Sequence, residues 1–289
     1  MVDYITYHIQ SSEAKDIDPS NDALRYVADR FELNIEQRYW LAFLFGTCYS
    51  ATNVYYIYNE FPDYENVDVN RLRRWWDSHK HQTLFQTDRL RVKTQDKFVE
   101  TFESYRNLMN GRTQADYFAS LKQPTRQNTY DNCFQDLSQI RNFGRFTMFI
   151  YLEMVNVLTG YDFEPTILDL KNAESCRNGL VYYLNRPELD THGKKKTISK
   201  RAIQYLQYEF SELKNLIQSS DVEHKNIWNI ETTLCAYKKY RLGKRYVGYY
   251  IERMRKEIEK METLVPYGVD WSVLWQFRKE TYDKKWLTK

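Results

Sequence analysis

Glycine and proline are scarce in this 289-residue chain, which contains 9 Gly and 6 Pro. Their combined share is roughly half of the usual one, so few residues break regular structure. The 4 Cys lie far apart with no C-x-x-C pair. This spacing excludes a zinc ribbon and a dense disulfide framework, and it favours a reducing, intracellular setting. The longest apolar run, Trp40–Phe45, is too short to span a bilayer, and residues 1–20 lack a basic-then-apolar leader. We therefore expect a protein that is neither exported nor embedded in a membrane.

Several common catalytic and cofactor motifs are also missing. The chain has no G-x-x-x-x-G-K-[ST] phosphate loop, no G-x-G-x-x-G, no H-E-x-x-H and no G-x-S-x-G. These absences disfavour ATP hydrolysis, dinucleotide cofactors and two common hydrolase chemistries. His79 and His81 are close enough in sequence to share a metal ion, but no carboxylate pattern accompanies them, so exposed positions at a helix end explain them better. We expect no metal and no nucleotide or redox cofactor.

The chain is rich in aromatic residues and in helical periodicity. It contains 25 Tyr, 15 Phe and 7 Trp. Apolar residues recur at three- and four-residue steps, which is typical of amphipathic helices, and no convincing strand alternation with a hairpin turn is found. About ten helices are predicted, over residues 22–31, 36–58, 70–79, 95–109, 130–137, 145–158, 198–217, 227–237, 246–264 and 271–282. The predicted fold class is all-α.

The charge distribution singles out one basic stretch. The net charge is only +3, but residues 191–245 hold 12 Lys or Arg against 5 Asp or Glu. Lys195 lies at the centre of a Lys-Lys-Lys run in this stretch. We expect one helical domain over residues 1–289, in which lobes 20–185 and 198–289 are joined by a basic loop, 186–197. The positive charge of this loop is typical of a phosphate-binding segment, and a solvent-exposed linker accounts for the same charge equally well.

The first segment that suggests a specific chemistry is a short turn before an apolar helix. Residues 140–147 read Ile-Arg-Asn-Phe-Gly-Arg-Phe-Thr. Backbone N–H groups at such a helix start bind phosphate oxygens, and Arg145 adds a positive charge. The segment resembles the hairpin of the helix-hairpin-helix DNA glycosylases, with Asn142 in place of the first Gly, a residue that tolerates left-handed backbone. A monovalent cation at the hairpin and an ordinary interhelical turn both remain open.

Asp169 and Arg177 form the second segment. Asp169 follows Gly144 by 25 residues. In the glycosylase group a carboxylate follows the hairpin at roughly this distance and faces the flipped nucleotide. Asp169 is therefore a candidate acid, base or charge stabiliser, and the alternative is a helix cap.

The third and fourth segments also combine carboxylates with cations. Glu231, Cys235 and Lys238 recur at helical steps, which predicts a carboxylate and an ammonium on one face, with Lys239 beside them. A surface Glu and Lys around a buried thiol is the alternative. In Phe85–Lys93, the residues Asp88, Arg89 and Lys93 suit a bound phosphate, and a salt-bridged loop explains them as well.

Taken in order, these segments resemble the phage α-glutamyl/putrescinyl thymine pyrophosphorylases, also called amino acid:DNA transferases, and the related helical domain of 5-hydroxymethyluridine DNA kinases. The resemblance covers most of the chain and is most specific in Glu231–Lys239 and Gly248–Tyr250. It implies a helix-hairpin-helix glycosylase-like fold and a role in DNA hypermodification. In that process 5-hydroxymethyluracil is activated with phosphate, and a transferase displaces the phosphate group with an amine. Because the kinase phosphate loop is absent, the chain resembles the transferase.

The resemblance also implies substrates, a partner and a location. The substrates are double-stranded DNA with modified thymine and an amino acid or polyamine donor, the partner is a 5-hydroxymethyluridine DNA kinase, and the location is the cytoplasm of an infected bacterium. We expect the target base to be flipped and stacked on Trp40, Tyr49, Trp228 and Tyr250. The candidates for the base that takes the proton of the amine are Glu231, Asp169 and Asp88, in that order. The candidates for neutralising the leaving group are Arg89, Lys93, Arg145, Arg177, Lys238 and Lys239.

Three other functions remain open from the sequence. A glycosylase-like module that binds or reads modified DNA without chemistry would show salt-dependent DNA affinity and no base product. A DNA base glycosylase would release free base. A plain helical interaction protein would not bind DNA even at low salt.

Overall fold

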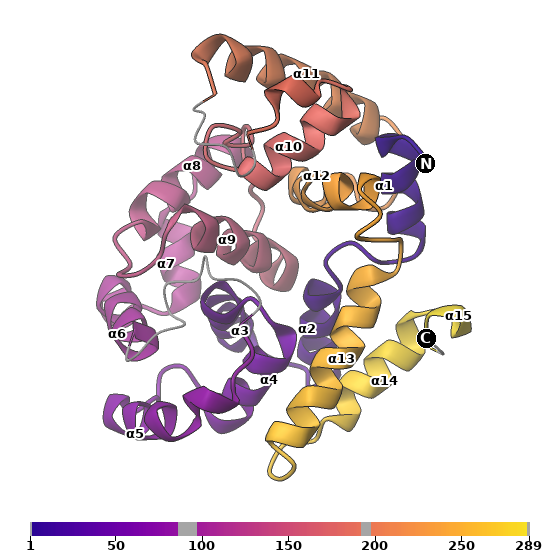
Figure 1. The fold of residues 1–289 in the computed structure, drawn as a ribbon. Coiled ribbons are helices and arrows are strands. Elements are labelled where there is room, and N and C mark those ends of the chain that lie inside the picture. The colour runs from indigo at the N-terminus through magenta and orange to yellow at the C-terminus, as the bar shows by residue number, and fades with distance from the viewer. Residues whose placement is uncertain (1, 86–96, 192–197, 288–289) are drawn as a thin grey trace. The chain divides into compact units, whose positions relative to one another are not determined.

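A computed structural model describes residues 2–85, 97–191 and 198–287 (Figure 1). No strand occurs in these ranges, which confirms the all-α class, and no helix in them has the length and apolar character needed to cross a membrane. The described ranges hold fifteen α-helices, so the prediction of about ten was too low. They are α1 (Tyr4–Glu13), α2 (Pro19–Arg30), α3 (Ile35–Cys48), α4 (Ala51–Glu60), α5 (Val69–His79), α6 (Lys97–Met109), α7 (Gln114–Ser120), α8 (Arg126–Leu137), α9 (Arg145–Thr159), α10 (Glu174–Tyr183), α11 (Lys200–Gln218), α12 (Ile227–Arg241), α13 (Tyr249–Leu264), α14 (Ser272–Thr281) and α15 (Lys284–Leu287).

One predicted helix, residues 36–58, is in fact two. Helix α3 ends at Cys48 because Tyr49 adopts left-handed backbone, with φ 49° and ψ 42°. Ser50 then caps α4, and its hydroxyl accepts a hydrogen bond from the backbone N–H of Asn53 at 3.4 Å. Apolar residues continue across the break, so their periodicity alone does not reveal it.

Four helices, α1, α7, α10 and α15, lie outside every predicted range. Helices α7 and α15 have only 7 and 4 residues. The buried sides of α1 and α10 include polar residues, among them His8, Ser11, Arg177 and Asn178. An apolar stripe is therefore incomplete in both, and the periodicity that revealed the other helices is lacking.

The chain divides into two compact units that interleave in sequence. Unit 1 comprises Met1–Pro19, Pro165–Met254 and Thr281–Lys289, and unit 2 comprises Ser20–Glu164 and Arg255–Glu280. The expected lobes, 20–185 and 198–289, do not coincide with these units. The N-terminal helix α1 belongs with α10 and α12, and the second half of α13 belongs with α2 to α9.

Unit 2 is built around α3 and α9, which pack against each other. Gly46 lies at this contact, where a Cβ atom would come within 2.7 Å of the Cβ of Tyr151. Aromatic rings fill the space around it. The ring of Phe43 stacks on that of Tyr105 with centroids 4.2 Å apart, and the Tyr151 hydroxyl donates to the Tyr105 hydroxyl at 3.1 Å. Much of the aromatic content is thus core.

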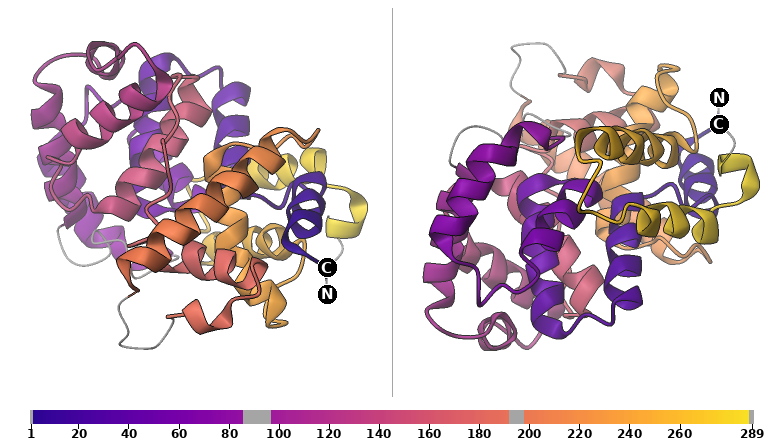
Figure 2. Two further views of the ribbon diagram at one scale, coloured as in Figure 1. Left: turned by 90° about the horizontal axis from the view of Figure 1, so that it is seen from above. Right: turned by 90° about the horizontal axis from the view of Figure 1, so that it is seen from below.

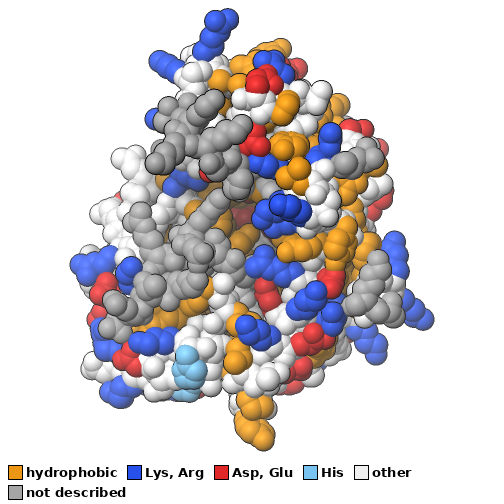
Figure 3. All heavy atoms as spheres, viewed as in Figure 1, with side chains coloured by type: hydrophobic (Ala, Val, Ile, Leu, Met, Phe, Trp, Pro, Cys, Tyr) orange, Lys and Arg blue, Asp and Glu red, His pale blue; other side chains and the backbone are white. Residues whose placement is uncertain are grey.

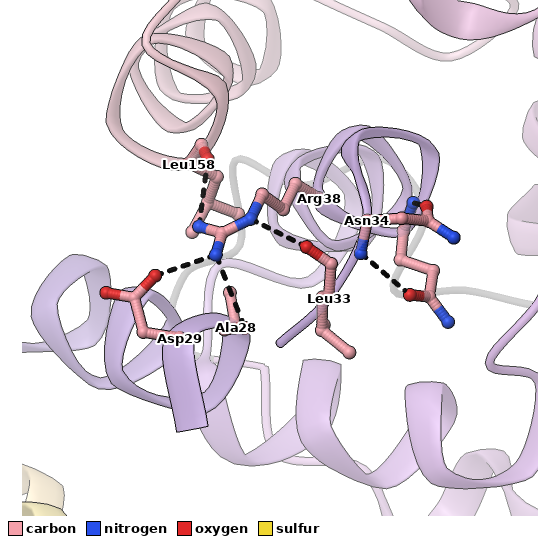
Figure 4. Close-up of polar contacts among 7 residues, drawn as sticks. Ala28, Asp29, Leu33, Asn34, Arg38 and Leu158 are labelled. Carbon is pink, nitrogen blue, oxygen red and sulfur yellow. Dashed lines mark hydrogen bonds and ion pairs between the residues drawn. The ribbon is translucent and has the colours of Figure 1, made fainter. Parts of the chain in front are cut away.

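Arg38 joins the ends of two helices to the start of α3 (Figure 4). Its guanidinium donates to the carbonyl oxygens of Leu33 at 3.0 Å, Leu158 at 3.3 Å and Ala28 at 3.4 Å, and it pairs with Asp29 at 2.7 Å. Ala28 and Leu158 lie in the last turns of α2 and α9, where carbonyl groups lack helical partners. Arg38 is therefore a structural residue of unit 2.

The part of α13 that belongs to unit 2 lies beside α14 (Figures 1 and 2). The Trp275 indole donates to a Glu262 carboxylate oxygen at 2.7 Å, and the Trp271 indole donates to the Val265 carbonyl at 3.0 Å. The Tyr55 hydroxyl of α4 donates to the Asp270 carbonyl at 3.2 Å. The two indole bonds join α13 and α14 to each other, and the bond from Tyr55 attaches this helical pair to the rest of unit 2.

Unit 1 is built around α10 and α12. Their backbones meet at Gly179, where a Cβ atom would lie 1.9 Å from the Leu234 carbonyl oxygen. Helix α1 also packs on α12, where the Thr233 hydroxyl is joined by hydrogen bonds of 2.8 Å to the Tyr4 hydroxyl and to Nδ1 of His8. Burial lowers the pKa of His8 to about 4, so its imidazole is neutral in the folded state at neutral pH.

Asp16 fixes the start of α13 within unit 1. Its buried carboxylate accepts hydrogen bonds from the backbone N–H groups of Gly248 at 2.7 Å, Tyr250 at 2.9 Å and Ile251 at 2.9 Å. Gly248 has a φ of 96°, and a Cβ atom there would meet the Trp286 ring at 2.2 Å. Burial raises the pKa of Asp16 to about 7, and the three N–H donors oppose that increase.

Candidate functional site

The predicted site residues divide among three locations. Asp88, Arg89, Lys93 and Lys195 lie outside the described residues. Trp40, Tyr49 and Arg145 belong to unit 2, and the others belong to unit 1, namely Asp169, Arg177, Trp228, Glu231, Lys238, Lys239 and Tyr250.

The hairpin before α9 has the predicted local geometry. Asn142 has a φ of 66°, so it occupies the left-handed region that its short side chain tolerates. Its side-chain amide donates to the Thr101 hydroxyl at 3.1 Å, and the backbone N–H of Arg141 donates to the Ser104 hydroxyl at 2.9 Å. Both bonds attach the hairpin to α6. Gly144 begins α9 without a side-chain cap.

Arg145 and Tyr49 flank this hairpin in unit 2. Arg145 is the first residue of α9 and is half-buried. The Tyr49 ring, also half-buried, meets the ring of Phe146 edge to face with centroids 5.4 Å apart. A half-exposed ring therefore lies beside a helix start that carries a cation.

Arg177, a candidate for neutralising the leaving group, is a buried cation of unit 1. Its guanidinium donates to the carbonyl oxygens of Leu170 at 2.7 Å and Lys171 at 2.8 Å, and to the Thr191 hydroxyl at 2.6 Å. All three acceptors are neutral groups. No carboxylate therefore neutralises the positive charge of Arg177 through a direct hydrogen bond. Burial lowers the pKa of Arg177, while Glu174 and other nearby acidic groups oppose that shift.

Asp169 stabilises the turn before α10, whose carbonyl oxygens also accept hydrogen bonds from Arg177. Its carboxylate accepts hydrogen bonds from the backbone N–H of Asn172 at 3.2 Å and from the Asn172 amide at 2.9 Å. Its carbonyl accepts from the N–H of Ala173 at 2.7 Å, just before α10. Asp169 therefore stabilises the turn before α10 but does not cap this helix, whose N-cap residue is Ala173 and has no side-chain cap.

Lys238 is paired rather than presented to solvent. Its ammonium lies 2.6 Å from the Asp190 carboxylate, and both side chains keep only about 15% of their surface exposed, at 14% and 15%. It also lies over the Tyr182 ring of α10, 5.5 Å from the centroid. Asp190 was missed because it lies 48 residues from Lys238, in the polar stretch taken as a loop. Lys239, in contrast, is exposed.

Glu231 and Cys235 share one face of α12, as the spacing predicted. The Cys235 thiol donates to a Glu231 carboxylate oxygen at 3.2 Å, and both side chains are half-buried. The remaining cysteines, Cys48, Cys133 and Cys176, are buried. Unit 1 therefore brings a half-exposed carboxylate onto the same helix as the Lys238–Asp190 pair.

Two of the four rings expected to stack on a base are core residues, a correction to that expectation. Trp40 has no exposed surface, and its indole donates to the Phe61 carbonyl at 2.7 Å. Trp228 is 1% exposed. Stacking requires an accessible ring face, which neither tryptophan offers.

Tyr250 keeps part of its surface but already has a cationic partner. The Arg245 guanidinium donates to the Tyr250 hydroxyl and lies 4.8 Å from its ring centroid. The ring of Tyr249 meets Tyr250 edge to face at 5.4 Å. Burial raises the pKa of Tyr250, so its hydroxyl stays protonated.

Two adjoining hollows in unit 2 involve none of the predicted residues. One, of about 390 Å³, is lined by Glu100, Glu103 and Arg141, and the other, of about 480 Å³, by Tyr64 and Arg112.

On the face drawn in Figure 3, Lys and Arg side chains lie among Asp and Glu outside the grey atoms. Among the described residues no three His, Cys, Asp or Glu side chains are grouped to hold a metal ion.

Comparison with known proteins identifies relatives. The family model for amino acid:DNA transferase matches residues 12–246, a range that includes the hairpin, α10 and α12. A protein of Salmonella phage ViI named serinyltransferase is 30% identical over 262 residues. That similarity covers 84% of this chain and 63% of the relative, so the chain spans less than two thirds of the relative's length.

Proposed function

Because the chain belongs to the amino acid:DNA transferase family, we propose that it transfers an amino acid or another amine to activated 5-hydroxymethyluracil in double-stranded DNA. The observation that carries this proposal is the family match across residues 12–246, which includes the polar residues of α10 and α12. Serine is the first donor to test, since the phage relative is named a serinyltransferase. A 5-hydroxymethyluridine DNA kinase supplies the activated base, and the reaction takes place in the cytoplasm of an infected bacterium.

The proposed reaction is a substitution at the 5-methylene carbon of the base. The bond between this carbon and the phosphate oxygen breaks, and pyrophosphate or phosphate leaves with the electron pair. A bond forms from the amine nitrogen to the carbon, and the nitrogen then loses one proton. The protein must supply a proton acceptor and positive charge near the leaving group.

Glu231 is the proposed proton acceptor. It is half-buried on α12, and one of its carboxylate oxygens accepts a hydrogen bond from the Cys235 thiol. Asp169 is a less suitable acceptor because its carboxylate already holds the turn before α10 through Asn172. Asp88 stays a third candidate outside the described residues.

Positive charge is divided between buried and exposed groups in this proposal. Arg177 contributes a fixed charge through space, since its direct partners are neutral. Lys238 is held by Asp190 and contributes less. Contacts to DNA phosphates are assigned to Lys239 and Arg145, and Arg89, Lys93 and Lys195 remain candidates for the same role.

The fold proposed for the whole chain is helix-hairpin-helix glycosylase-like, supported by the left-handed Asn142 and the uncapped start of α9. In this scheme the target base is flipped and stacks on Tyr49 or Tyr250, the two candidate rings that keep exposed surface. The two units act together as one DNA-modifying domain.

The test compares Glu231→Gln with wild type on duplex DNA that carries pyrophosphorylated 5-hydroxymethyluracil, with serine as the donor. We expect the transfer rate to fall by at least about 100-fold because a general base is removed, while DNA affinity changes little. Glu212→Gln, an exposed position on α11, is the matched control and should transfer at the wild-type rate. Full activity of Glu231→Gln would remove Glu231 from the mechanism.

A further inference from the structure

Residues 239–248, here called the basic turn, join the last turn of α12 to the start of α13 (Figure 1). From residue 232 to residue 251 the chain has five Lys or Arg and no Asp or Glu. One of the five, Lys238, is paired with Asp190. The other four lie in the basic turn, two of them exposed (Lys239 and Lys244) and two half-buried (Arg241 and Arg245). Positive charge is therefore concentrated in one short segment of unit 1.

The backbone of the basic turn is fixed at both ends. At the end of α12, the N–H of Lys244 donates to the carbonyl of Lys239 at 2.8 Å. Gly243 between them has a φ of 70°, the left-handed conformation that commonly ends a helix. At the start of α13, the N–H of Gly248 donates to the buried Asp16 carboxylate at 2.7 Å. Lys244 thus belongs to a defined turn whose position is set by the fold of unit 1.

Aromatic rings lie among these cations. The Tyr246 side chain is 43% exposed, and its ring meets that of Tyr249 edge to face with centroids 6.0 Å apart. The Arg245 guanidinium lies 4.9 Å from the ring centroid of Tyr249 and 4.8 Å from that of Tyr250. Lys244 has no ion-pair partner among the described residues. The surface therefore offers an available ammonium beside an exposed ring.

This combination suits a nucleic-acid strand. Lysine side chains contact phosphate oxygens, and exposed rings pack on bases or sugars, so cations interleaved with rings follow a sugar-phosphate backbone. The backbone N–H groups of Arg245, Tyr246 and Val247 bond to no group of the described residues, and such N–H groups also donate to phosphate oxygens. Glu252, the first acidic residue after the turn, accepts a hydrogen bond from the Tyr246 hydroxyl.

We propose that the basic turn binds DNA phosphates beside the flipped target nucleotide, with Lys244 and Lys239 as its main contacts. This inference rests on the proposed function, which makes DNA the substrate, and it adds the surface that positions the strand. Lys239 follows Glu231 by eight residues on α12, which is about 12 Å along the helix axis. The turn holds the backbone of the strand, and the proton transfer is left to Glu231. Lys244 is thus a positioning residue.

The first test measures how the DNA affinity of the full chain depends on salt. The probe is a duplex with unactivated 5-hydroxymethyluracil and no donor, so that no transfer occurs, and binding is followed by fluorescence anisotropy between about 50 and 200 mM salt. Each lost phosphate contact lowers the slope of log Kd against log salt concentration by about 0.9. We expect this change for Lys244→Gln and about twice this change when Lys239→Gln is added. Lys244→Arg keeps the charge and should keep the wild-type slope.

Lys260→Gln is the matched control. Lys260 is exposed on α13 within unit 2, close in sequence to Glu257 and Glu259. Its replacement removes the same charge as Lys244→Gln and should leave the slope unchanged. Both variants should melt at the wild-type temperature, because both side chains are exposed. A control that lowers the slope as much as Lys244→Gln would show an effect of net charge alone and would overturn the inference.

A kinetic measurement separates positioning from chemistry. On activated duplex DNA, Lys244→Gln should raise KM roughly 3- to 10-fold while kcat stays within twofold of wild type, since the lost contact contributes to binding. A kcat that falls with KM unchanged would contradict the positioning role.

The outcomes distinguish this inference from the function on which it rests. If wild type binds DNA with a slope that depends on Lys244 but transfers no amine, the proposed function fails and the binding surface stands. If wild type transfers an amine and Lys244→Gln keeps the wild-type slope, only the inference is overturned.

Discussion

Replacing Gly179 by alanine tests how closely α10 and α12 pack. The added Cβ would lie 1.9 Å from the carbonyl oxygen of Leu234 and 2.6 Å from its carbonyl carbon. Ordinary contacts begin at 3.4 Å, so the two backbones would have to separate by about 1.5 Å. The atoms of Leu234 belong to the helical backbone of α12, so no side-chain rotation relieves the overlap.

Two opposing effects determine the change in the free energy of unfolding of Gly179→Ala. Alanine favours a helix over glycine by about 1 kcal/mol. Overpacking in a close contact costs about 1–3 kcal/mol, and a clash between two backbones belongs at the upper end. We therefore expect a net loss of about 2 kcal/mol, together with reduced transfer activity, because α12 carries Glu231.

The assay is urea unfolding followed by circular dichroism, with Gly111→Ala as the control. Gly111 has a φ of 77° and no atom within 4 Å of the built Cβ, so only backbone strain of about 1–2 kcal/mol is expected there. A Gly179→Ala protein as stable as wild type, or more stable by the helix preference of alanine, would refute the close contact.

Two further predictions concern buried charge. Burial lowers the pKa of His8 from 6.5 to about 4. Between these two pH values the folded state therefore binds fewer protons at His8 than the unfolded state does. Stabilisation that is complete above pH 6.5 is therefore lost as the pH falls toward 4, by about 3 kcal/mol in all. Urea unfolding of wild type and His8→Gln across this range isolates the effect from that of Asp16, and a constant difference between the two proteins would contradict it. For the pair of Lys238 and Asp190, Asp190→Asn should lower the free energy of unfolding by about 2 kcal/mol, less than the loss of a fully buried pair, and adding Lys238→Met should restore most of it. Equal stability of Asp190→Asn and wild type in the same assay would show that the pair contributes nothing.

Local features of the fold were predictable from sequence because their causes lie within a few residues. Helical periodicity predicted a helix start near residue 36, and the structure has a capping box there between Asn34 and Gln37. The left-handed Asn142 followed in the same way from its residue type. The left-handed Tyr49 did not, because an aromatic residue rarely adopts that conformation and nothing nearby in the sequence indicates it.

The contacts of the candidate site were less predictable because they join distant segments. The approach of Cys235 to Glu231 follows from helical spacing. The pairing of Lys238 with Asp190 joins positions in different segments, and sequence shows that a lysine is charged without showing its partner. Composition likewise gives the number of aromatic rings and not their burial, which is why Trp40 was expected to stack on the base although it is a core residue.

The most direct test of the proposed activity uses the wild-type protein, duplex DNA with pyrophosphorylated 5-hydroxymethyluracil, and a mixture of serine, other amino acids and polyamines. The DNA is then digested to nucleosides, which are weighed by mass spectrometry while released pyrophosphate is measured. The account predicts a thymidine derivative that carries the donor amine on its 5-methylene carbon, and one pyrophosphate released for each such nucleoside. Unchanged nucleosides together with tight DNA binding would contradict the transferase and support a reader of modified DNA, and free base with abasic sites would indicate a glycosylase.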